Sequence, residues 1–316
     1  MMPNRLESLK ESTVIVADTG EIETIRRLKP QDCTTNPTLL FKAAGSEAYQ
    51  SVVAGAIDRA KQKSGADVHA VADMLAVSFG SELLKIVPGY VSTEVDADLS
   101  FDTAATIDKA KRLIDLYADM GADTDRVLIK IASTWEGIRA AERLQKDGIK
   151  CNLTLLFGMH QAVACAEAGV TLISPFVGRI RDWFVKAGHT DFDDENDPGV
   201  VFVRRVYSYY KRHGYDTIVM GASFRTLGEI EALAGCDRLT ISPALLDELA
   251  GQDGAVERKL SPNLAGRFGE DKLDASEAAF RWGMNEDAMA TEKLAEGIRM
   301  FNKDLVALKK LLAEKL

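Results

Sequence analysis

The sequence predicts an α/β fold, a single (β/α)8 TIM barrel with extra helices, on the basis of three observations. Eight short apolar runs occur along the chain, and each is followed by a segment with helical periodicity, which is typical of such a barrel. No GxGxxG motif opens any of these units, which disfavours the competing doubly wound open sheet. A length of 316 residues is also common for one barrel domain. We therefore expect residues 1–316 to form one domain.

The predicted strands are short apolar runs of the kind that is buried in a parallel sheet. In chain order they are Val14–Ala17, Cys33–Thr35, Tyr90–Val95, Arg126–Ile131, Cys151–Leu156, Val170–Ser174, Thr217–Met220 and Arg238–Ile241.

Helix start signals follow three of these strands. Asp102 is the predicted N-cap of a helix whose apolar residues recur on one face. Ser133 and Glu136 fit a capping box directly after the fourth strand. Ser242 followed by Pro243 predicts another helix, because proline favours the first helical position.

Two segments lie outside the eightfold repeat. Between Asn36 and Val87 there is room for two helices, so this crossover is longer than a barrel unit needs. A polar stretch at 251–274 precedes a long C-terminal helix, and we expect 251–316 to form a helical extension packed on the barrel. The apolar side chains of that helix alternate spacings of four and three: Leu294, Ile298, Phe301, Leu305, Leu308 and Leu312. A self-association seam is the alternative interpretation of this pattern.

The composition argues against several classes of partner. The 39 Lys and Arg residues against 48 Asp and Glu residues give a net charge of −9, without the basic stripe of a nucleic-acid binder. No apolar run approaches the roughly 18 residues that a membrane span needs. The first residues, MMPNRLESLKES, lack the apolar core of a signal peptide, so we expect a cytoplasmic protein.

Neither the cysteines nor the histidines suggest a bound metal. The four cysteines are widely spaced and contain no CxxC motif, which indicates reduced core residues. The four histidines show no HxH or HExxH spacing, so a zinc-dependent mechanism is not expected. We therefore expect no metal and no cofactor.

Lys130 is the most informative residue, because it interrupts the apolar run from Val127 to Ala132. Lysines are almost never fully buried without a partner or a purpose. Desolvation lowers the pKa of an amine, and a neutral amine can attack a carbonyl substrate to form a Schiff base. The alternative is a lysine at a strand end, whose stem packs while its ammonium group reaches solvent.

The ends of the predicted strands carry a coherent set of side chains. In (β/α)8 barrels the active site lies at the carboxyl ends of the strands, and several strands supply catalytic groups. Seven of the eight predicted strands supply such groups: Asp18, Asn36, Glu94, Asp96, Lys130, Asn152, Thr154, Ser174, Phe176, Arg179, Ser223 and Arg225.

Several of these residues have two possible interpretations. Glu94 and Asp96 share one strand face with Ser92, because side chains alternate with period two. Two inward carboxylates need a cation or a proton-transfer role, and the alternative is a buried ion pair with a structural lysine or arginine. Arg179 and Arg225 follow strands six and seven, where guanidinium groups suit a phosphate, but they could equally be surface residues.

The other polar residues at the strand ends also have a structural and a functional interpretation. The Asp18-Thr-Gly segment is also an ordinary turn, and Asn36 before Pro37 also fits an N-cap with a proline at the first helical position. Asn152 and Thr154 lie within a buried strand, where an unpaired polar group costs about 1–3 kcal/mol. That cost favours a functional interpretation for these two residues.

Taken together, these segments resemble the classical bacterial transaldolases, class I Schiff-base aldolases of the pentose phosphate pathway. The resemblance extends along almost the whole chain and is carried by VADTG (16–20), DCTTNPTLL (32–40), STEVDADLS (92–100), RVLIKIASTWEGIRAAE (126–142), CNLTLLF (151–157), LISPFVGRI (172–180) and VMGASFR (219–225). The departures are small. Cys33 stands where alanine is common, GMH (158–160) follows LLF where relatives vary, and residues 255–285 match less clearly.

The resemblance implies that Lys130 attacks the C2 ketone of a phosphorylated ketose to form a carbinolamine and then an imine. Glu94 would supply the proton for loss of the hydroxyl, through a water held by Thr154. Asp18 would take the proton of the C4 hydroxyl, which cleaves the C3–C4 bond and leaves a three-carbon enamine on Lys130. An aldose phosphate would then enter, and the steps would reverse.

The resemblance also implies roles in substrate binding. Asn36, Asn152 and Ser174 would orient the hydroxyls of the bound fragment. Arg179, Ser223 and Arg225 would hold the phosphate group. The implied reaction converts sedoheptulose 7-phosphate and glyceraldehyde 3-phosphate into erythrose 4-phosphate and fructose 6-phosphate. By the same analogy, the protein is expected to be a homodimer.

Phe176 bears on the choice between transfer and simple cleavage. Related fructose 6-phosphate aldolases release free dihydroxyacetone and have a tyrosine at the matching place. A phenyl ring has no hydroxyl to position a protonating water, so Phe176 favours transfer, and simple cleavage is the alternative function.

Two rivals belong to other classes. One is a metal-dependent barrel hydrolase or isomerase that uses Glu94 and Asp96 as ligands, which the lack of clustered histidines disfavours. The other is a non-catalytic barrel that only binds, which would leave the full set of catalytic residue types unexplained.

Overall fold

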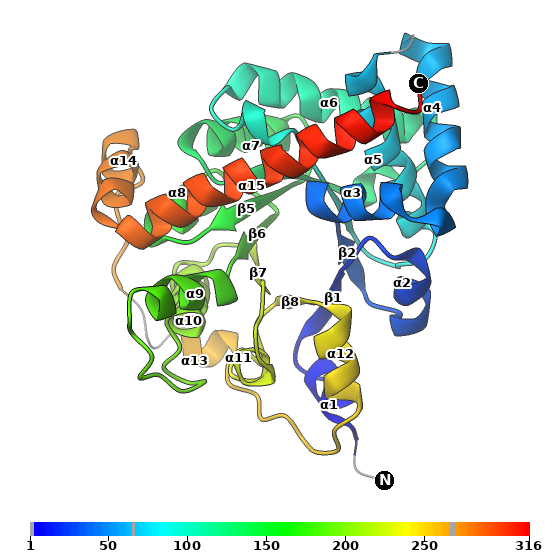
Figure 1. The fold of residues 1–316 in the computed structure, drawn as a ribbon. Helices are drawn as coiled ribbons and strands as arrows, with labels where there is room; N and C mark the ends of the chain where they lie inside the picture. Colours follow the sequence, from blue (N-terminus) through cyan, green and yellow to red (C-terminus); the bar gives the residue numbers. More distant parts are fainter. Residues whose placement is uncertain (1–2, 65–66, 266–269) are drawn as a thin grey trace.

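The computed structural model describes residues 3–64, 67–265 and 270–316. Eight parallel strands pair in chain order and close into a barrel, which confirms the predicted (β/α)8 fold (Figure 1). The strands are β1 (Val14–Asp18), β2 (Asp32–Thr34), β3 (Val91–Glu94), β4 (Val127–Ala132), β5 (Cys151–Leu156), β6 (Leu172–Pro175), β7 (Ile218–Ala222) and β8 (Arg238–Ile241). Every predicted strand is present, with ends that agree to within two residues.

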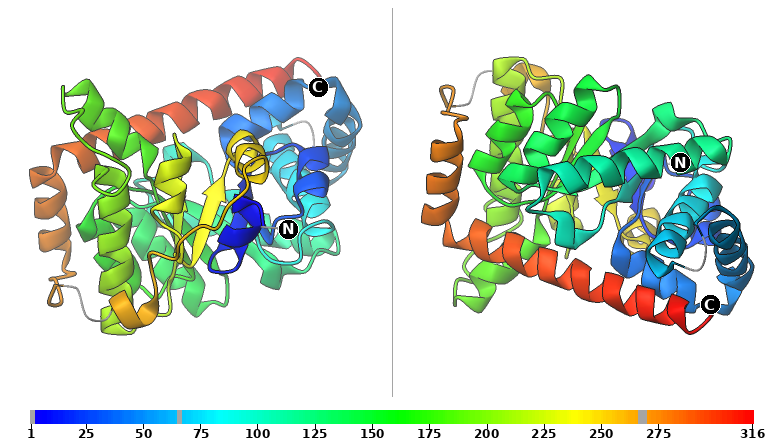
Figure 2. Two further views of the ribbon diagram at one scale, coloured as in Figure 1. Left: turned by 90° about the horizontal axis from the view of Figure 1, so that it is seen from below. Right: turned by 90° about the horizontal axis from the view of Figure 1, so that it is seen from above.

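The helices surround the barrel in an outer layer (Figures 1 and 2). They are α1 (Arg5–Lys10), α2 (Ile22–Leu28), α3 (Pro37–Gly45), α4 (Gln50–Ser64), α5 (Val68–Leu84), α6 (Thr103–Asp119), α7 (Trp135–Lys146), α8 (Met159–Glu167), α9 (Gly178–Lys186), α10 (Pro198–His213), α11 (Leu227–Glu231), α12 (Pro243–Ala250), α13 (Pro262–Ala265), α14 (Glu277–Glu286) and α15 (Ala288–Ala313). Three short 3₁₀ turns also occur: η1 (Glu47–Tyr49), η2 (Ala97–Leu99) and η3 (Thr124–Arg126).

The inside of the barrel is filled by an apolar layer from four strands: Val16, Leu128, Leu172 and Met220. Side chains two positions further along a strand point to the same side of the sheet. The next interior positions on β1, β4 and β6 are therefore Asp18, Lys130 and Ser174. The apolar layer thus forms a floor, and polar groups lie directly above it at the carboxyl ends of the strands.

Two of the three predicted helix starts are confirmed. The Asp102 carboxylate accepts a hydrogen bond from the N–H of Ala105 at 2.9 Å, and α12 begins at Pro243 after Ser242. The capping box predicted for Ser133 is wrong. Thr134 is the N-cap of α7 and accepts from the N–H of Gly137, while the Ser133 hydroxyl donates to a carbonyl of the neighbouring strand β5.

The long crossover between β2 and β3 holds three α-helices instead of the predicted two. The chain leaves helical geometry at Ser46, where φ is −84° and ψ is 138°, and this ends α3 early. The Gln50 side chain donates to the carbonyls of Ala44 and Ser46 at 3.1 and 2.9 Å, which satisfies the open end of that helix. Sequence periodicity does not register such a side-chain cap.

The predicted long C-terminal helix is confirmed as α15, and a separate helix, α14, precedes it. The break lies at Asp287, whose side chain accepts from the N–H of Ala290 and so starts α15. The apolar face of α15 is buried against the rest of the protein. Residues 266–269 of the polar stretch predicted at 251–274 lie outside the described residues, as do residues 1–2 of the N-terminal segment.

Helix α15 lies across the carboxyl ends of the strands. It packs against α3, η2 and α9, which directly follow β2, β3 and β6, and it also contacts β5. Figure 1 shows α15 crossing in front of the barrel, and both views of Figure 2 place it along one side of the molecule. Within 3–64, 67–265 and 270–316, no helix is long and apolar enough to cross a membrane.

Candidate active site

The centre of the candidate site is the side chain of Lys130 on β4. This residue is 5% exposed, and its Nζ lies 3.1 Å from Oε2 of Glu94, its register partner on β3. The same nitrogen donates to the carbonyl of Thr35 at 3.3 Å, just past the end of β2. The ammonium group therefore does not reach solvent, so the strand-end alternative is wrong.

A cavity at the carboxyl ends of the strands brings most of the predicted residues together. Its lining includes eight of them: Asp18, Asn36, Lys130, Thr154, Ser174, Phe176, Arg179 and Ser223. The rest of the lining comes from Thr34, Met220, Ala222, Thr240 and Phe301. Residues from all parts of the sequence thus meet at one end of the barrel.

Two carboxyl groups beside Lys130 have perturbed protonation. Burial raises the pKa of Asp18, and the charge of Lys130 opposes that shift together with a hydrogen bond from Thr34 at 3.2 Å. Burial likewise raises the pKa of Glu94, again opposed by the charge of Lys130. Raised carboxyl pKa values near an amine suit groups that exchange protons with a substrate.

A chain of hydrogen bonds holds the polar residues of β3, β5 and β6. The amide of Asn152 donates to the Ser92 hydroxyl at 3.1 Å, and the Ser174 hydroxyl donates to the amide oxygen of Asn152 at 2.7 Å. Asn152 is fully buried beneath the lining residue Ser174. The Thr154 hydroxyl is also buried, and it finds no hydrogen-bonding partner among the described residues. A substrate hydroxyl or a water in the cavity would satisfy it.

Asn36 is both the N-cap of α3 and a residue that lines the cavity. Its side-chain oxygen caps α3 by accepting from the N–H of Leu39 at 2.9 Å, and Pro37 takes the first helical position. Its side chain also lines the cavity. The cap fixes the oxygen, so the amide nitrogen is the atom that can bind a ligand.

The three residues predicted to hold phosphate occupy one corner of the site. Burial lowers the pKa of Arg179, and the nearby charge of Arg225 lowers it further, which indicates two guanidinium groups close together. Arg225 lies outside the lining, and its Nε and Nη2 donate to Asp182 at 3.2 and 2.7 Å. Its Nη1 lies 3.4 Å from the hydroxyl of Ser223, which adopts a left-handed backbone with φ of 63°.

Asp96 does not belong with Glu94, so the prediction of two inward carboxylates is wrong. Strand β3 ends at Glu94, and Asp96 lies beyond it at the start of η2. Its carboxylate pairs with Lys109 and Lys309, each at 2.8 Å. The alternative interpretation, a buried structural ion pair, therefore describes Asp96. Within the part of the chain that is described, no three His, Cys, Asp or Glu side chains are grouped as metal ligands.

Five lining residues were not among the predicted site residues, and three of them, Thr34, Thr240 and Phe301, carry polar or aromatic side chains. Thr34 and Thr240 lie on β2 and β8, and their hydroxyls are 3.2 Å apart. A polar residue at an interior position of the eighth strand was a usable signal for Thr240. Phe301 belongs to the apolar stripe of α15, and that stripe gives no sign of a role at the barrel mouth.

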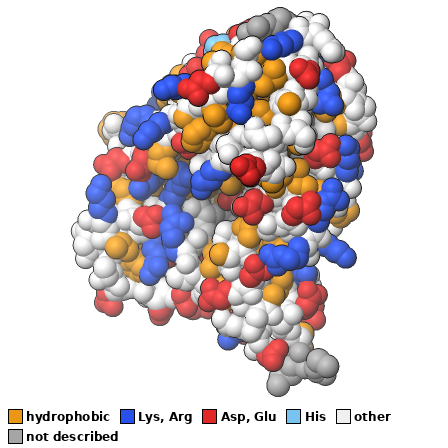
Figure 3. All heavy atoms as spheres, turned by 45° about the vertical axis from the view of Figure 1, so that its right-hand side comes forward, with side chains coloured by type: hydrophobic (Ala, Val, Ile, Leu, Met, Phe, Trp, Pro, Cys, Tyr) orange, Lys and Arg blue, Asp and Glu red, His pale blue; other side chains and the backbone are white. Residues whose placement is uncertain are grey.

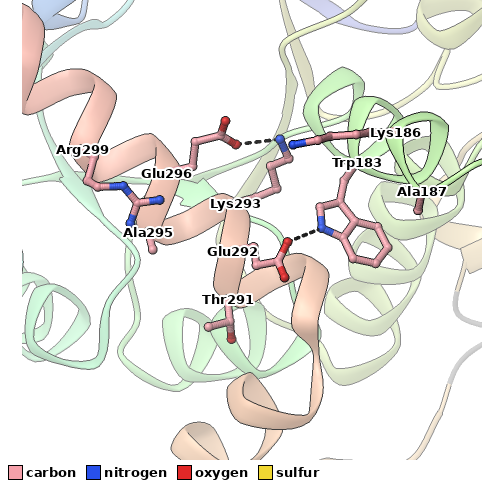
Figure 4. A pocket seen from close by; sticks show the side chains of 9 residues that line it. All are labelled: Trp183, Lys186, Ala187, Thr291, Glu292, Lys293, Ala295, Glu296 and Arg299. Carbon is pink, nitrogen blue, oxygen red and sulfur yellow. Dashed lines mark hydrogen bonds and ion pairs between the residues drawn. The ribbon is translucent and has the colours of Figure 1, made fainter.

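The surface of the molecule has hollows bordered by charged side chains. Figure 3 shows a hollow with Lys and Arg side chains gathered along one border. A separate hollow lies between α9 and α15 (Figure 4). There the indole N–H of Trp183 donates to Glu292 at 2.7 Å, and Lys293 pairs with Glu296 at 2.6 Å. The raised pKa values of Asp18 and Glu94 belong instead to the surroundings of Lys130.

The fold and the site define the class, a (β/α)8 barrel whose mouth holds a buried lysine beside two carboxyl groups, as expected for an aldolase-type enzyme. The family model described as Transaldolase/Fructose-6-phosphate aldolase matches residues 15–312. The chain therefore belongs to this family. It is an enzyme of the transaldolase type, a transferase.

Full-length relatives support this assignment. A protein named Transaldolase from Rhizobium etli is 59% identical over 318 residues, covering 100% of this chain and 98% of the relative. One from Cellvibrio japonicus is 60% identical over 314 residues, with 98% of each chain covered. One from Alteromonas mediterranea is 59% identical over 319 residues, covering 100% of this chain and 99% of the relative.

The raised pKa of Asp18 predicts a pH-dependent effect on stability. A carboxyl group whose folded pKa is above its ordinary 3.8 costs stability once the pH rises through that raised pKa, and costs nothing well below 3.8. Asp18→Asn should therefore raise the urea midpoint at pH 7–8, and this gain should vanish as the pH falls towards 3.8.

Asp247→Asn is the matched control for this prediction. A hydrogen bond from Arg27 lowers the pKa of the exposed Asp247, so its loss should slightly lower the midpoint at neutral pH. Urea unfolding of the three proteins across this pH range measures both effects. An unchanged or lower midpoint for Asp18→Asn at pH 7–8 would contradict the prediction.

Proposed function

We propose that this enzyme transfers a dihydroxyacetone unit from a ketose phosphate to an aldose phosphate through a Schiff base on Lys130. The donor is sedoheptulose 7-phosphate or fructose 6-phosphate, and the acceptor is glyceraldehyde 3-phosphate or erythrose 4-phosphate, in the non-oxidative pentose phosphate pathway. The observation that carries the proposal is the buried Lys130–Glu94 pair at the barrel mouth.

The first steps form the Schiff base. The Lys130 amine adds to the C2 carbonyl of the ketose, which gives a carbinolamine. Glu94 lies 3.1 Å from that nitrogen and has a raised pKa, so it can accept the ammonium proton and return it. The returned proton leaves with the carbinolamine hydroxyl as water. The unpartnered hydroxyl of Thr154 would hold the water that relays this proton.

Cleavage and transfer follow on the same lysine. Asp18 takes the proton from the C4 hydroxyl, the C3–C4 bond breaks, and the electron pair moves into the imine to give an enamine. The raised pKa of Asp18 makes its carboxylate a better base for this step. The aldose product leaves and a second aldose phosphate enters. The enamine carbon attacks its aldehyde carbon while Asp18 gives the proton back.

The substrate is held by groups at two places. Asn36, Asn152 and Ser174 orient the hydroxyls of the three-carbon fragment close to Lys130. Arg179, Ser223 and Arg225 hold the phosphate, because guanidinium groups bind phosphate oxygens through paired N–H donors. Arg225 would have to exchange part of its contact with Asp182 for the phosphate.

Phe176 favours transfer over release of free dihydroxyacetone. Its ring packs edge-on against Phe157 at 5.3 Å, and the Arg179 guanidinium lies over it at 4.9 Å. The ring is held in place and offers no hydroxyl to a protonating water. Cleavage like that of a fructose 6-phosphate aldolase is the alternative function.

Two further proposals concern the location of the enzyme and its domain organisation. We propose a cytoplasmic enzyme, in keeping with four free and buried cysteines, which suit a reducing compartment. We also treat residues 1–316 as one domain, with 251–316 as an extension packed on the barrel, since Leu308 and Leu312 of α15 are buried.

A homodimer is the proposed oligomeric state. The outer side of α15 exposes Met300 by 46% and Val306 by 58%, which is apolar surface that a second copy could cover. Light scattering during gel filtration should give twice the mass of one chain at micromolar concentration. A single-chain mass at the highest soluble concentration would rule out the dimer.

Replacing the proposed nucleophile tests the mechanism directly. Lys130→Met should lower transfer activity by at least about 10⁴-fold, because among the described residues no other lysine lines the cavity. Borohydride reduction with fructose 6-phosphate should leave a three-carbon adduct on the Lys130 peptide of the wild type, detected by peptide mass mapping. Lys85→Met, at the exposed lysine that directly follows α5, is the control and should retain full activity and the adduct. An adduct on another lysine would contradict the assignment.

A hydroxyl placed on Phe176 should shift the reaction towards cleavage. Phe176→Tyr keeps the ring and supplies a group that can position water beside the enamine. Free dihydroxyacetone formed from fructose 6-phosphate without acceptor should rise about tenfold relative to transfer, as measured by a coupled assay. Phe157→Tyr places a hydroxyl on the neighbouring ring, which does not line the cavity, and should leave the ratio unchanged. If both variants behave like the wild type, Phe176 does not set the outcome.

A further inference from the structure

Phe301 is a residue of the C-terminal helix that reaches the reactive lysine. It is 3% exposed, and its ring lines the cavity with Lys130 and Thr154. The ring centroid lies 5.7 Å from Nζ of Lys130 and 5.6 Å from the guanidinium carbon of Arg179.

Contacts along its length fix α15 over the barrel mouth. At one end, Trp183 of α9 donates to Glu292, as Figure 4 shows. Near the other end, Lys309 pairs with Asp96 at 2.8 Å, and Asp96 also pairs with Lys109 of α6. Between them, Thr38 of α3 donates to Asp304. The helix therefore cannot slide without breaking contacts to three different parts of the rim.

The close approach of α15 to β5 adds a further constraint. A Cβ atom at Gly297 would lie 2.6 Å from a terminal methyl carbon of Leu155, so a larger residue at this position would have to displace the Leu155 side chain. Leu155 has a left-handed backbone with φ of 53° at the irregular end of β5, directly after Thr154. One turn further along α15, Phe301 reaches the cavity at the height of Lys130.

Two aromatic rings line the cavity beside the same guanidinium group. Phe176 and Phe301 both contact the Arg179 guanidinium, at 4.9 and 5.6 Å. Below them lie the polar groups that bind the sugar. Water that reaches the enamine carbon from above must pass these rings.

We infer that Phe301, held by the Lys309–Asp96 ion pair, determines whether the three-carbon fragment is transferred or lost. The inference rests on the proposed Schiff-base function. On the productive route, the enamine carbon forms a bond with the acceptor aldehyde. On the wasteful route, water protonates that carbon, a second water adds to the resulting imine, and dihydroxyacetone leaves as the Lys130 amine is restored. The Phe301 ring excludes the first water.

The face of the ring has a second effect on the same lysine. An aromatic ring attracts a cation placed over its face. The protonated imine carries its positive charge on the Lys130 nitrogen, so Phe301 stabilises this intermediate while it blocks water. Lys309 and Asp96 do not touch the reacting atoms and act as positioning residues.

The test compares two rates in each protein, which are dihydroxyacetone release from fructose 6-phosphate alone and transfer to glyceraldehyde 3-phosphate. Phe301→Ser removes the ring and should raise the ratio of release to transfer by tenfold or more. Phe301→Leu keeps an apolar group and should raise it less. Leu305→Ala is the control for helix packing, because Leu305 is buried on α15 but does not line the cavity, and it should lower stability without changing the ratio.

The role of the Lys309–Asp96 ion pair is tested by a substitution outside the cavity lining. Lys309→Met should raise the ratio several-fold, and Lys310→Met, at an exposed neighbour, should not. Equal loss of both rates in Phe301→Ser, together with wild-type ratios in Phe301→Leu and Lys309→Met, would overturn the inference. Failure of the proposed function is distinguishable, because the wild type itself would then show neither transfer nor a borohydride-trapped adduct.

Discussion

The buried pair of Lys130 and Glu94 is the interaction on which the rest of the structure depends. Both side chains are 6% exposed, and such pairs seldom recover in mutual attraction what they lose in hydration. Apolar residues at these two positions would pack the barrel at lower cost. The protein instead maintains an amine and a carboxyl group at a distance where a proton can move between them. This arrangement is useful only if the surroundings keep bulk water away.

Below Lys130 and Glu94, the interior of the barrel itself keeps water out. The interior side chains of one layer, among them Val16, Leu128 and Leu172, are apolar and close the lumen. The period of two along each strand then places Asp18, Lys130 and Ser174 one layer higher without any change of direction. A short apolar strand with one polar residue near its end therefore specifies both the apolar floor and the polar layer above it. The hydrogen bonds through Asn152 satisfy the polar groups that remain buried between them.

The parts predictable from the sequence are those governed by local rules. All eight strands and most of the lining residues follow from short apolar runs and the groups at their ends, and Lys130 stands out because it breaks such a run. Details that depend on contacts between distant segments were not predictable. Thr134 rather than Ser133 caps α7, since the Ser133 hydroxyl is drawn to β5. Asp96 leaves the interior because β3 ends two residues earlier and lysines of α6 and α15 lie within reach.

Phe301 shows why some functional residues cannot be recognised from periodicity. The strand ends are occupied by the polar groups that we propose bind and activate the sugar, so an apolar cover has to come from outside the eightfold repeat. Helix α15 supplies it, and the same stripe that buries Leu305 and Leu308 against the protein also carries Phe301 over the cavity. The residues of α15 that only pack and the residue that also covers the cavity are therefore all apolar and follow the same helical spacing. Only the place where α15 crosses the rim, set by Gly297 and the Lys309–Asp96 pair, distinguishes one role from the other.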